Sequence, residues 1–265
     1  MTRAQWAGPA DVGAVAARMR ELGAGLGPGD GVGVFNRVYL AVTEELARRL
    51  AAGAFSDGPE AAALAVRFAG RYLAAVGDGG SGAPACWRPL LRSRARPGIR
   101  PLQFALAGIN AHVCHDLALA VVDTCRATGR TPAAIRADYG EVGGVLTAIE
   151  IRVREELMPG PDLLERFEPL THRVGAWSLE RARGGAWEAA RALWALRDRP
   201  SAYAECAHRL DEAVALIGRA LLTPLCGQRA GTARYAIPSA AQPSVRPTAR
   251  PTAQPSGSST GAISS

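Results

Sequence analysis

The stretch ALAGINAHVCHDLALAVVD (residues 105–123) decides how the chain folds, because it is apolar along its length yet carries two histidines, a cysteine and an aspartate at its centre. On a helical wheel at about 100° per residue, His112, His115 and Asp116 share one narrow polar sector with apolar residues on both sides. A helix with apolar flanks of this kind is predicted to be mostly buried. Its buried polar groups then need hydrogen-bonding or metal partners.

The rest of the chain up to about residue 225 is predicted to form helices separated by loops that are rich in glycine and proline. In residues 30–53, Val34, Val38 and Leu46 recur at helical spacing, and Gly53 follows as a stop signal. The predicted helices cover 10–23, 30–53, 59–76, 102–128, 131–160, 162–198 (one long or two short) and 200–225, with a long loop at 77–101. Alternating β-branched runs are absent, so we expect no sizeable sheet. The predicted fold is all-α, a single bundle of about seven helices.

The last part of the sequence has a different composition from the rest. From Gly227 it consists mainly of Pro, Ser, Thr, Ala and Gly, and VRPTARPTAQPSGSSTG repeats a Pro-Thr unit. Such a segment buries too little apolar surface to offset its ordering entropy. The sequence therefore predicts a helical domain over residues 1–226 and a disordered tail over residues 227–265.

The basic charge of the chain is a weak indication of its partners. All 31 basic residues are arginine, which together with 30 Gly and 18 Pro is typical of a GC-rich genome such as an actinobacterial one. The tail contributes +4 of the net charge of +7, so the body carries +3. No arginine cluster alternates with aromatic residues and no nucleic-acid motif is present. We expect a small-molecule substrate and no nucleic-acid partner, and the oligomeric state stays open.

Cysteine usage and hydropathy indicate a cytoplasmic protein. The five cysteines are an odd number and form no C-x-x-C pair, which favours reduced thiols over a disulfide framework or a zinc ribbon. The N-terminus has no apolar segment of the signal-peptide type. There is no uninterrupted apolar run of about 18 residues, so no transmembrane span is expected.

The central stretch is also the first candidate for a chemical site. His112 and Asp116 are four residues apart, so an imidazole and a carboxylate one helical turn apart can bind one cation. His115 is a candidate ligand, an orienting residue or a proton-transfer group. One helix supplies too few ligands, so other segments must contribute, and Asp138 is a candidate third ligand although the residues alone favour a helix-dipole role for it. The alternatives are a solvated polar stripe for the histidine segment and a helix-dipole partner for Asp138.

Further polar candidates lie in FNRVYLAVTEEL (residues 35–46) and in the central helix. Asn36, Tyr39 and Thr43 share one helical face, and the alternative to a catalytic role is a hydrogen-bonded polar edge. The predicted catalytic residues in these stretches are His115, Asn36 and Tyr39, beside the predicted metal ligands His112, Asp116 and Asp138. A P-loop, a Rossmann glycine fingerprint, a G-x-S-x-G elbow and the D-D-x-x-D signature are all absent.

Several motifs together resemble an actinobacterial, all-helical domain family of unknown function over roughly residues 30–225. The shared patterns are F-N-x-x-Y, N-A-H-x-x-x-D-L and D-[FY]-x-x-V-N, seen here as FNRVY, NAHVCHDL and DYGEVG. The resemblance marks Phe35, Asn36, Tyr39, Asn110, His112, Asp116 and Asp138, and it adds Asn110 to the predicted catalytic residues. The sequence departs from the pattern at Gly143, where asparagine is expected, so a role at that position is in doubt. The resemblance implies that His112 and Asp116 belong to a motif, but it supplies no reaction.

The predicted function is that of a metal-dependent enzyme using a divalent ion, zinc or magnesium, most economically to hydrolyse a phosphoester. This step rests on analogy with the helical His/Asp zinc sites of all-α phospholipase-C and nuclease folds. A lyase or cyclase acting on an isoprenoid-like substrate in an apolar cavity is one alternative. A non-catalytic helical binding protein is the other.

Overall fold

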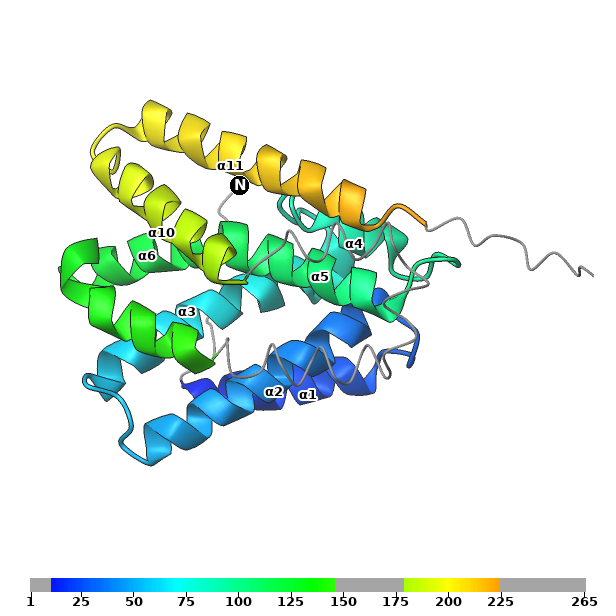
Figure 1. Cartoon of the computed structure of the whole chain (residues 1–265), viewed down its shortest axis with the longest axis horizontal. Helices are drawn as coiled ribbons and strands as arrows, with labels where there is room; N and C mark the ends of the chain where they lie inside the picture. The colour runs from blue at the N-terminus through cyan, green and yellow to red at the C-terminus, as the bar shows by residue number, and fades with distance from the viewer. Residues whose placement is uncertain (1–10, 146–178, 225–265) are drawn as a thin grey trace, which may run out of the picture. The chain divides into compact units, whose positions relative to one another are not determined.

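The computed structural model describes residues 11–145 and 179–224, and within these ranges it contains helices and connecting loops but no strand, so the predicted all-α class is confirmed (Figure 1). The elements are α1 (Val12–Ala24), α2 (Gly31–Ala51), α3 (Gly58–Val76), the 3₁₀ helix η1 (Gly77–Gly80), α4 (Arg88–Ser93), α5 (Pro101–Ala111), the π-helical turn η2 (His112–Asp116), α6 (Leu117–Thr128), the 3₁₀ helix η3 (Pro132–Ile135), α10 (Leu179–Ala195) and α11 (Pro200–Leu221).

The helix predicted at the centre of the fold lies in the core. α5, η2 and α6 follow one another without a break, α5 packs against α2 and α11, and α6 packs against α3 and α10 (Figure 1). α1 packs against α2 and α3. Almost every residue of this central stretch is buried, including Asn110, His112, His115 and Asp116. These four residues therefore face other protein groups, so a solvated stripe does not include Asp116 or the histidines, whereas Asp123 and Arg126 of the same stripe are partly exposed and exposed.

Three aspartates explain where the N-terminal helices begin. Asp11 accepts a hydrogen bond from the Ala14 amide at the start of α1. Asp30 accepts hydrogen bonds from two amides in the first turn of α2, and Asp57 accepts one at the start of α3. Each carboxylate satisfies backbone donors that the helix itself leaves unpaired.

Gly108 of α5 allows α2 and α5 to pack closely against each other. A Cβ at Gly108 would lie 2.3 Å from ring atoms of Phe35, which is closer than real Cβ contacts. Phe35 is buried and its ring meets Tyr72, Trp87 and His112 at centroid distances of 5.1, 5.5 and 5.9 Å. The absence of a side chain at Gly108 therefore lets α2 bring its aromatic residues to the histidine turn.

The structure corrects several predicted boundaries. The predicted loop at 77–101 contains η1 and the short helix α4. The helix predicted from residue 131 begins with the 3₁₀ turn of η3 and is α-helical over 136–145. The central helix is interrupted by a π-turn that apolar periodicity does not reveal. The rest of the segment up to 178 and the predicted tail at 227–265 lie outside the described residues.

Residues Pro101–Thr128 are long and apolar enough to cross a membrane on length and composition alone, with a mean hydropathy of 1.5 in the most apolar window. In the structure, 89% of that window is buried among the other helices. Packing in the core therefore accounts for the apolar character of this stretch. The absence of a transmembrane span stays a prediction.

Candidate metal centre and the buried histidine–aspartate network

The segment His112–Asp116 forms a single π-helical turn, in which the Leu117 amide donates to the His112 carbonyl five residues earlier. Such turns are rare and often occur at functional sites. Adjacent residues on a regular helix do not face each other. Here His115 nevertheless reaches the carboxylate of its neighbour Asp116, and so does His112. The turn thereby directs two imidazoles to one carboxylate.

The Asp116 carboxylate is the centre of this network. Its Oδ2 atom accepts a hydrogen bond from Trp87 Nε1 at 2.9 Å and lies 3.0 Å from His112 Nδ1. Its Oδ1 atom lies 2.8 Å from His115 Nδ1. Burial would raise the pKa of this carboxyl, but the hydrogen bonds from the two histidines outweigh it and lower the pKa to about 2. Asp116 is therefore an ionised, fully buried group with three partners.

His112 is enclosed by aromatic rings. It stacks on Phe68 with centroids 3.7 Å apart, and Tyr39 meets its ring at 4.3 Å. Burial lowers the pKa of His112, against the opposing effect of Asp116. Burial thus favours the neutral imidazole, in which Nδ1 donates to Asp116 and Nε2 is an acceptor. Nε2 is buried without a hydrogen-bond partner among the described residues.

His115 faces a second group of polar residues through its other nitrogen. Its Nε2 atom lies 3.8 Å from Oδ1 of Asp211, a residue of α11. The Asp211 carboxylate in turn accepts hydrogen bonds from the backbone amides of Ala85 and Cys86, both at 2.8 Å. Three segments far apart in the sequence therefore meet at His115: the turn before α4, the π-turn and α11.

Cys86, His115 and Asp211 together have the donor set of a metal site. One ligand atom from each, a thiol sulfur, an imidazole nitrogen and a carboxylate oxygen, lies within 4.8 Å of the other two. In a tetrahedral zinc site the ligand atoms are roughly 3.3–3.8 Å apart, so closure around an ion needs shifts of about 1 Å. Cys86 and His115 are buried, while the Asp211 side chain is 17% exposed. The donor set is one that zinc prefers, and Asp211 on α11 is the most exposed of the three side chains.

Asp138 does not join this network. The described residues offer no metal-ligand group of three that unites it with His112 and Asp116. The charged groups that act on Asp138 are Asp57, Arg130, Glu141 and Glu60, and burial together with Asp57 raises the pKa of its carboxyl. The predicted ligand set of His112, Asp116 and Asp138 is therefore not brought together. Two of its members instead form the hydrogen-bonded network that holds His115.

The amides predicted as catalytic groups join helices to one another. Asn36 accepts a hydrogen bond from the Tyr72 hydroxyl at 3.0 Å and donates to the Met19 carbonyl at 2.9 Å. Asn110 donates to the Val214 carbonyl on α11 at 3.0 Å. Both side chains are buried. For Asn36 these contacts are those of the hydrogen-bonded polar edge that the sequence left open as the alternative.

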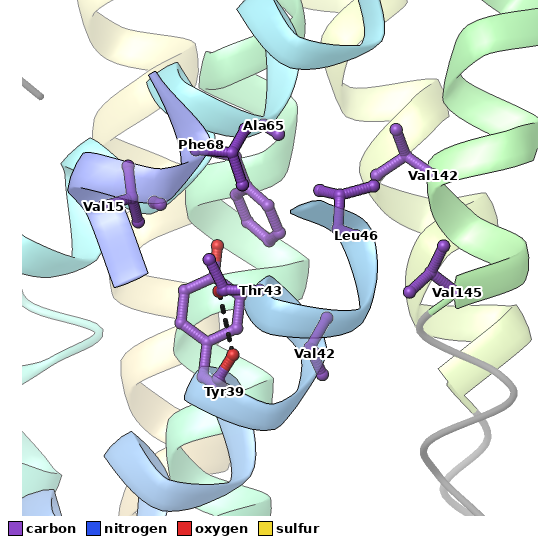
Figure 2. Close-up of a pocket in the computed structure, with 11 residues that line it drawn as sticks. Val15, Tyr39, Val42, Thr43, Leu46, Ala65, Phe68, Val142 and Val145 are labelled. Carbon is purple, nitrogen blue, oxygen red and sulfur yellow. Dashed lines mark hydrogen bonds between the residues drawn. The ribbon is translucent and has the colours of Figure 1, made fainter. Parts of the chain in front are cut away.

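Tyr39 lies between His112 and an apolar cavity. Figure 2 shows Tyr39 and Phe68 on one side of this cavity, with Val42, Leu46, Val142 and Val145 around it. The lining is almost entirely apolar, and the Thr43 hydroxyl is already bound to the Tyr39 carbonyl at 2.9 Å. The cavity has a volume of about 20 Å³, which is space for about one water molecule. It is too small for the isoprenoid-sized substrate that the cyclase alternative requires.

Comparison with known protein families identifies the family to which the chain belongs. A family model described as "Family of unknown function (DUF5995)" matches residues 12–224. The chain belongs to this family. The DUF5995 domain thus covers every helix of the structure, including all residues of the network and of the metal-ligand group. The comparisons with curated proteins and with solved structures gave no match.

The structure shows which side chain fills the space beside Gly143 of this DUF5995 domain. A Cβ placed there would lie 1.5 Å from Nη2 of Arg183, so the guanidinium occupies the space of a side chain. The Arg183 guanidinium also donates to the Tyr139 carbonyl at 3.3 Å, and the Tyr139 hydroxyl donates to the Arg183 carbonyl at 2.6 Å. An asparagine at position 143 would require Arg183 to move. The glycine is therefore part of the contact between α10 and the helical residues 136–145.

The sequence did not single out three members of the candidate site: Cys86, Trp87 and Asp211. Cys86 and Trp87 fall in the segment predicted as a loop, where a helical wheel has no meaning. Asp211 stands beside Glu212 on an amphipathic helix and looks like one more solvated acid. The one available signal is the adjacent Cys-Trp pair, because both residue types are seldom placed in exposed loops.

Proposed function

We propose that this DUF5995 domain is a metal-dependent hydrolase whose metal ion is bound by Cys86, His115 and Asp211. The observation that carries the proposal is the convergence of these three ligand atoms within 4.8 Å from three separate segments. The thiolate and imidazole favour zinc over magnesium, which prefers oxygen ligands. Zinc supplies a Lewis acid that activates water at neutral pH.

The network around Asp116 supports this assignment. Histidines that bind metals commonly donate their second ring N–H to a carboxylate, which fixes the tautomer and the ring orientation. His115 has this arrangement, with Nδ1 on Asp116 and Nε2 toward Asp211. Trp87 and His112 hold the carboxylate from its other oxygen. In this proposal they are positioning residues.

Asp211 has a double role in the proposed site. It orders the turn that carries Cys86 by accepting two backbone hydrogen bonds, and it offers an oxygen to the ion. It is also the ligand nearest to solvent, so substrate reaches the ion past α11. Three protein ligands leave a fourth position for water, which is the pattern of catalytic rather than structural zinc sites. Hydrolysis of a phosphoester is the reaction class that we assign to it.

The test is zinc-dependent hydrolysis of chromogenic phosphate mono- and diesters by the full chain. We expect turnover that is abolished by a chelator and restored by zinc. The variants Cys86→Ser and His115→Gln should each reduce this turnover by about 100-fold or more. Cys125→Ser is the matched control, because Cys125 is equally buried but lies in α6 away from the three ligands. Turnover that is absent from all esters, or that is unaffected by chelation, would overturn the proposal.

A further inference from the structure

A groove between α4 and the C-terminal half of α11 is lined by four arginines. Arg88 and Arg92 come from α4, Arg96 follows it, and Arg219 lies on α11. Glu212 is the one acidic side chain among the described residues that line the groove. The groove has a volume of about 450 Å³, within the range of roughly 300–1,000 Å³ that is common for small-molecule sites.

The arginines of this groove differ from several other exposed arginines of the chain, which are paired with a carboxylate. Arg18, Arg191 and Arg209 each pair with a glutamate three or four residues away on the same helix. By contrast, none of the four groove arginines forms a salt bridge with a carboxylate of residues 11–145 or 179–224.

The placement of these charges on α4 is unfavourable without a counter-ion. Arg88 and Arg92 are four residues apart on one short helix, and like charges at that spacing repel each other. Arg88 is held in place by a hydrogen bond from its Nε atom to the Ala83 carbonyl at 3.1 Å. A guanidinium fixed through Nε keeps its terminal nitrogens available for an anion. An anion between α4 and α11 would relieve the repulsion and bind several N–H donors.

We propose that this groove binds the phosphate groups of a small phosphorylated ligand. Planar guanidinium groups match phosphate oxygens with paired hydrogen bonds, and four of them exceed the one negative charge of Glu212. The groove adjoins the metal-ligand group, because Ala85 lines it and donates its amide to Asp211 at 2.8 Å. Identifying the ligand as the substrate of that centre rests on the proposed function. The binding of the anion does not.

The test is calorimetric titration of the full chain with inorganic pyrophosphate, with and without a chelator. We expect saturable binding, and about a tenfold loss of affinity for each arginine removed in Arg92→Gln and Arg219→Gln. The matched control for the double variant Arg92→Gln/Arg219→Gln is Arg18→Gln/Arg191→Gln, which removes the same two charges from exposed, salt-bridged positions. It should bind pyrophosphate as the wild type does.

The outcomes separate this proposal from the proposed function. Binding that survives chelation and is lost in the groove variants supports the anion site, even if the chain hydrolyses no phosphoester. Equal loss in the control variant would show an effect of net charge and overturn the site. Tighter binding of a DNA oligonucleotide that pyrophosphate does not displace would also overturn it, because the groove would then serve a polyanion. The anion site would also be overturned if the wild type did not bind pyrophosphate.

Discussion

His115 Nδ1 lies 2.8 Å from Oδ1 of Asp116, the next residue in the chain, and this contact turns the opposite ring nitrogen toward Asp211 on α11. The π-turn makes the contact possible. Asp116 is in turn fixed by Trp87 and His112. His115, a ligand in the proposed metal site, is therefore oriented by a buried network, which is the condition that a preorganised site requires.

Replacing Trp87 by Phe should destabilise the protein measurably. The change keeps an aromatic ring but removes the indole N–H that donates to ionised, buried Asp116. Hydrogen bonds to charged groups contribute about 1.5–3 kcal/mol, so we expect a loss of that size in the free energy of unfolding. Urea denaturation measures it. A loss below about 0.5 kcal/mol would mean that the Asp116 network does not depend on this donor.

Gly108→Ala should also lower stability, but for a steric reason. The new Cβ would lie 2.3 Å from the Phe35 ring, and overpacking of a well-filled core costs about 1–3 kcal/mol. Gly185→Ala is the matched control, because Gly185 is an exposed residue of α10 with nothing within 4 Å of its added Cβ. That control should gain about 0.5–1 kcal/mol from helix propensity. Equal effects at both positions would contradict the close packing of α2 on α5.

Asp138→Asn should raise stability at neutral pH more than in acid. Burial and Asp57 raise the pKa of Asp138 in the folded protein, so ionisation is less favourable there than in the unfolded chain. The stability of the wild type then falls as pH rises through the unfolded pKa of about 3.9 toward the higher folded value. Asparagine removes this loss. Urea midpoints of variant and wild type at pH 3.5 and pH 7 should differ more at pH 7, and the opposite order would contradict the prediction.

The same variant separates Asp138 from the metal centre. If Asp138 were a ligand, as the sequence alone favoured, Asp138→Asn would lose metal. The structure places it among Asp57, Arg130 and Glu141 instead. We therefore expect unchanged metal content in the purified variant, measured by elemental analysis. Loss of metal in this variant with retained fold would restore the sequence-based ligand set.

Removal of the ion should lower the melting temperature in a way that depends on Cys86. Zinc that binds the folded chain stabilises it by RT ln(1 + [Zn]/Kd), about 2.7 kcal/mol at a hundredfold excess over Kd. Thermal melts with and without chelator should therefore differ for the wild type and for Cys125→Ser. They should coincide for Cys86→Ser. A chelator effect of equal size in Cys86→Ser would place the ion elsewhere.

The fold followed from the sequence because apolar spacing and capping residues act locally. The aspartates that cap α1, α2 and α3 stand next to periodic apolar runs, and the predicted ranges agree with the observed helices within a few residues. The burial of the central helix was equally visible in its apolar flanks. Helix α4 was missed because its six residues are too short for a periodic signal.

The candidate site followed only in part, because its geometry depends on tertiary contacts. The sequence singled out His112, His115 and Asp116, and the structure unites these three. The wheel treated the segment as a regular helix, so it could not show that His115 and Asp116 contact each other in a π-turn. Nor could it show that Cys86 and Asp211, 125 residues apart, meet at the same imidazole. Asp138 was chosen by its motif, and its neighbours in space are different.

The central claim is tested most directly by the metal content of the untagged full chain beside that of Asp211→Asn. Asparagine keeps one of the two oxygens that accept the Ala85 and Cys86 amides and loses the other oxygen together with the negative charge, so the variant must also be shown to be folded. The account predicts near-stoichiometric zinc in the wild type and in Cys125→Ser, and little or none in a folded Asp211→Asn variant. The account would be contradicted if the wild type held no zinc after reconstitution, or if Asp211→Asn retained as much zinc as the wild type.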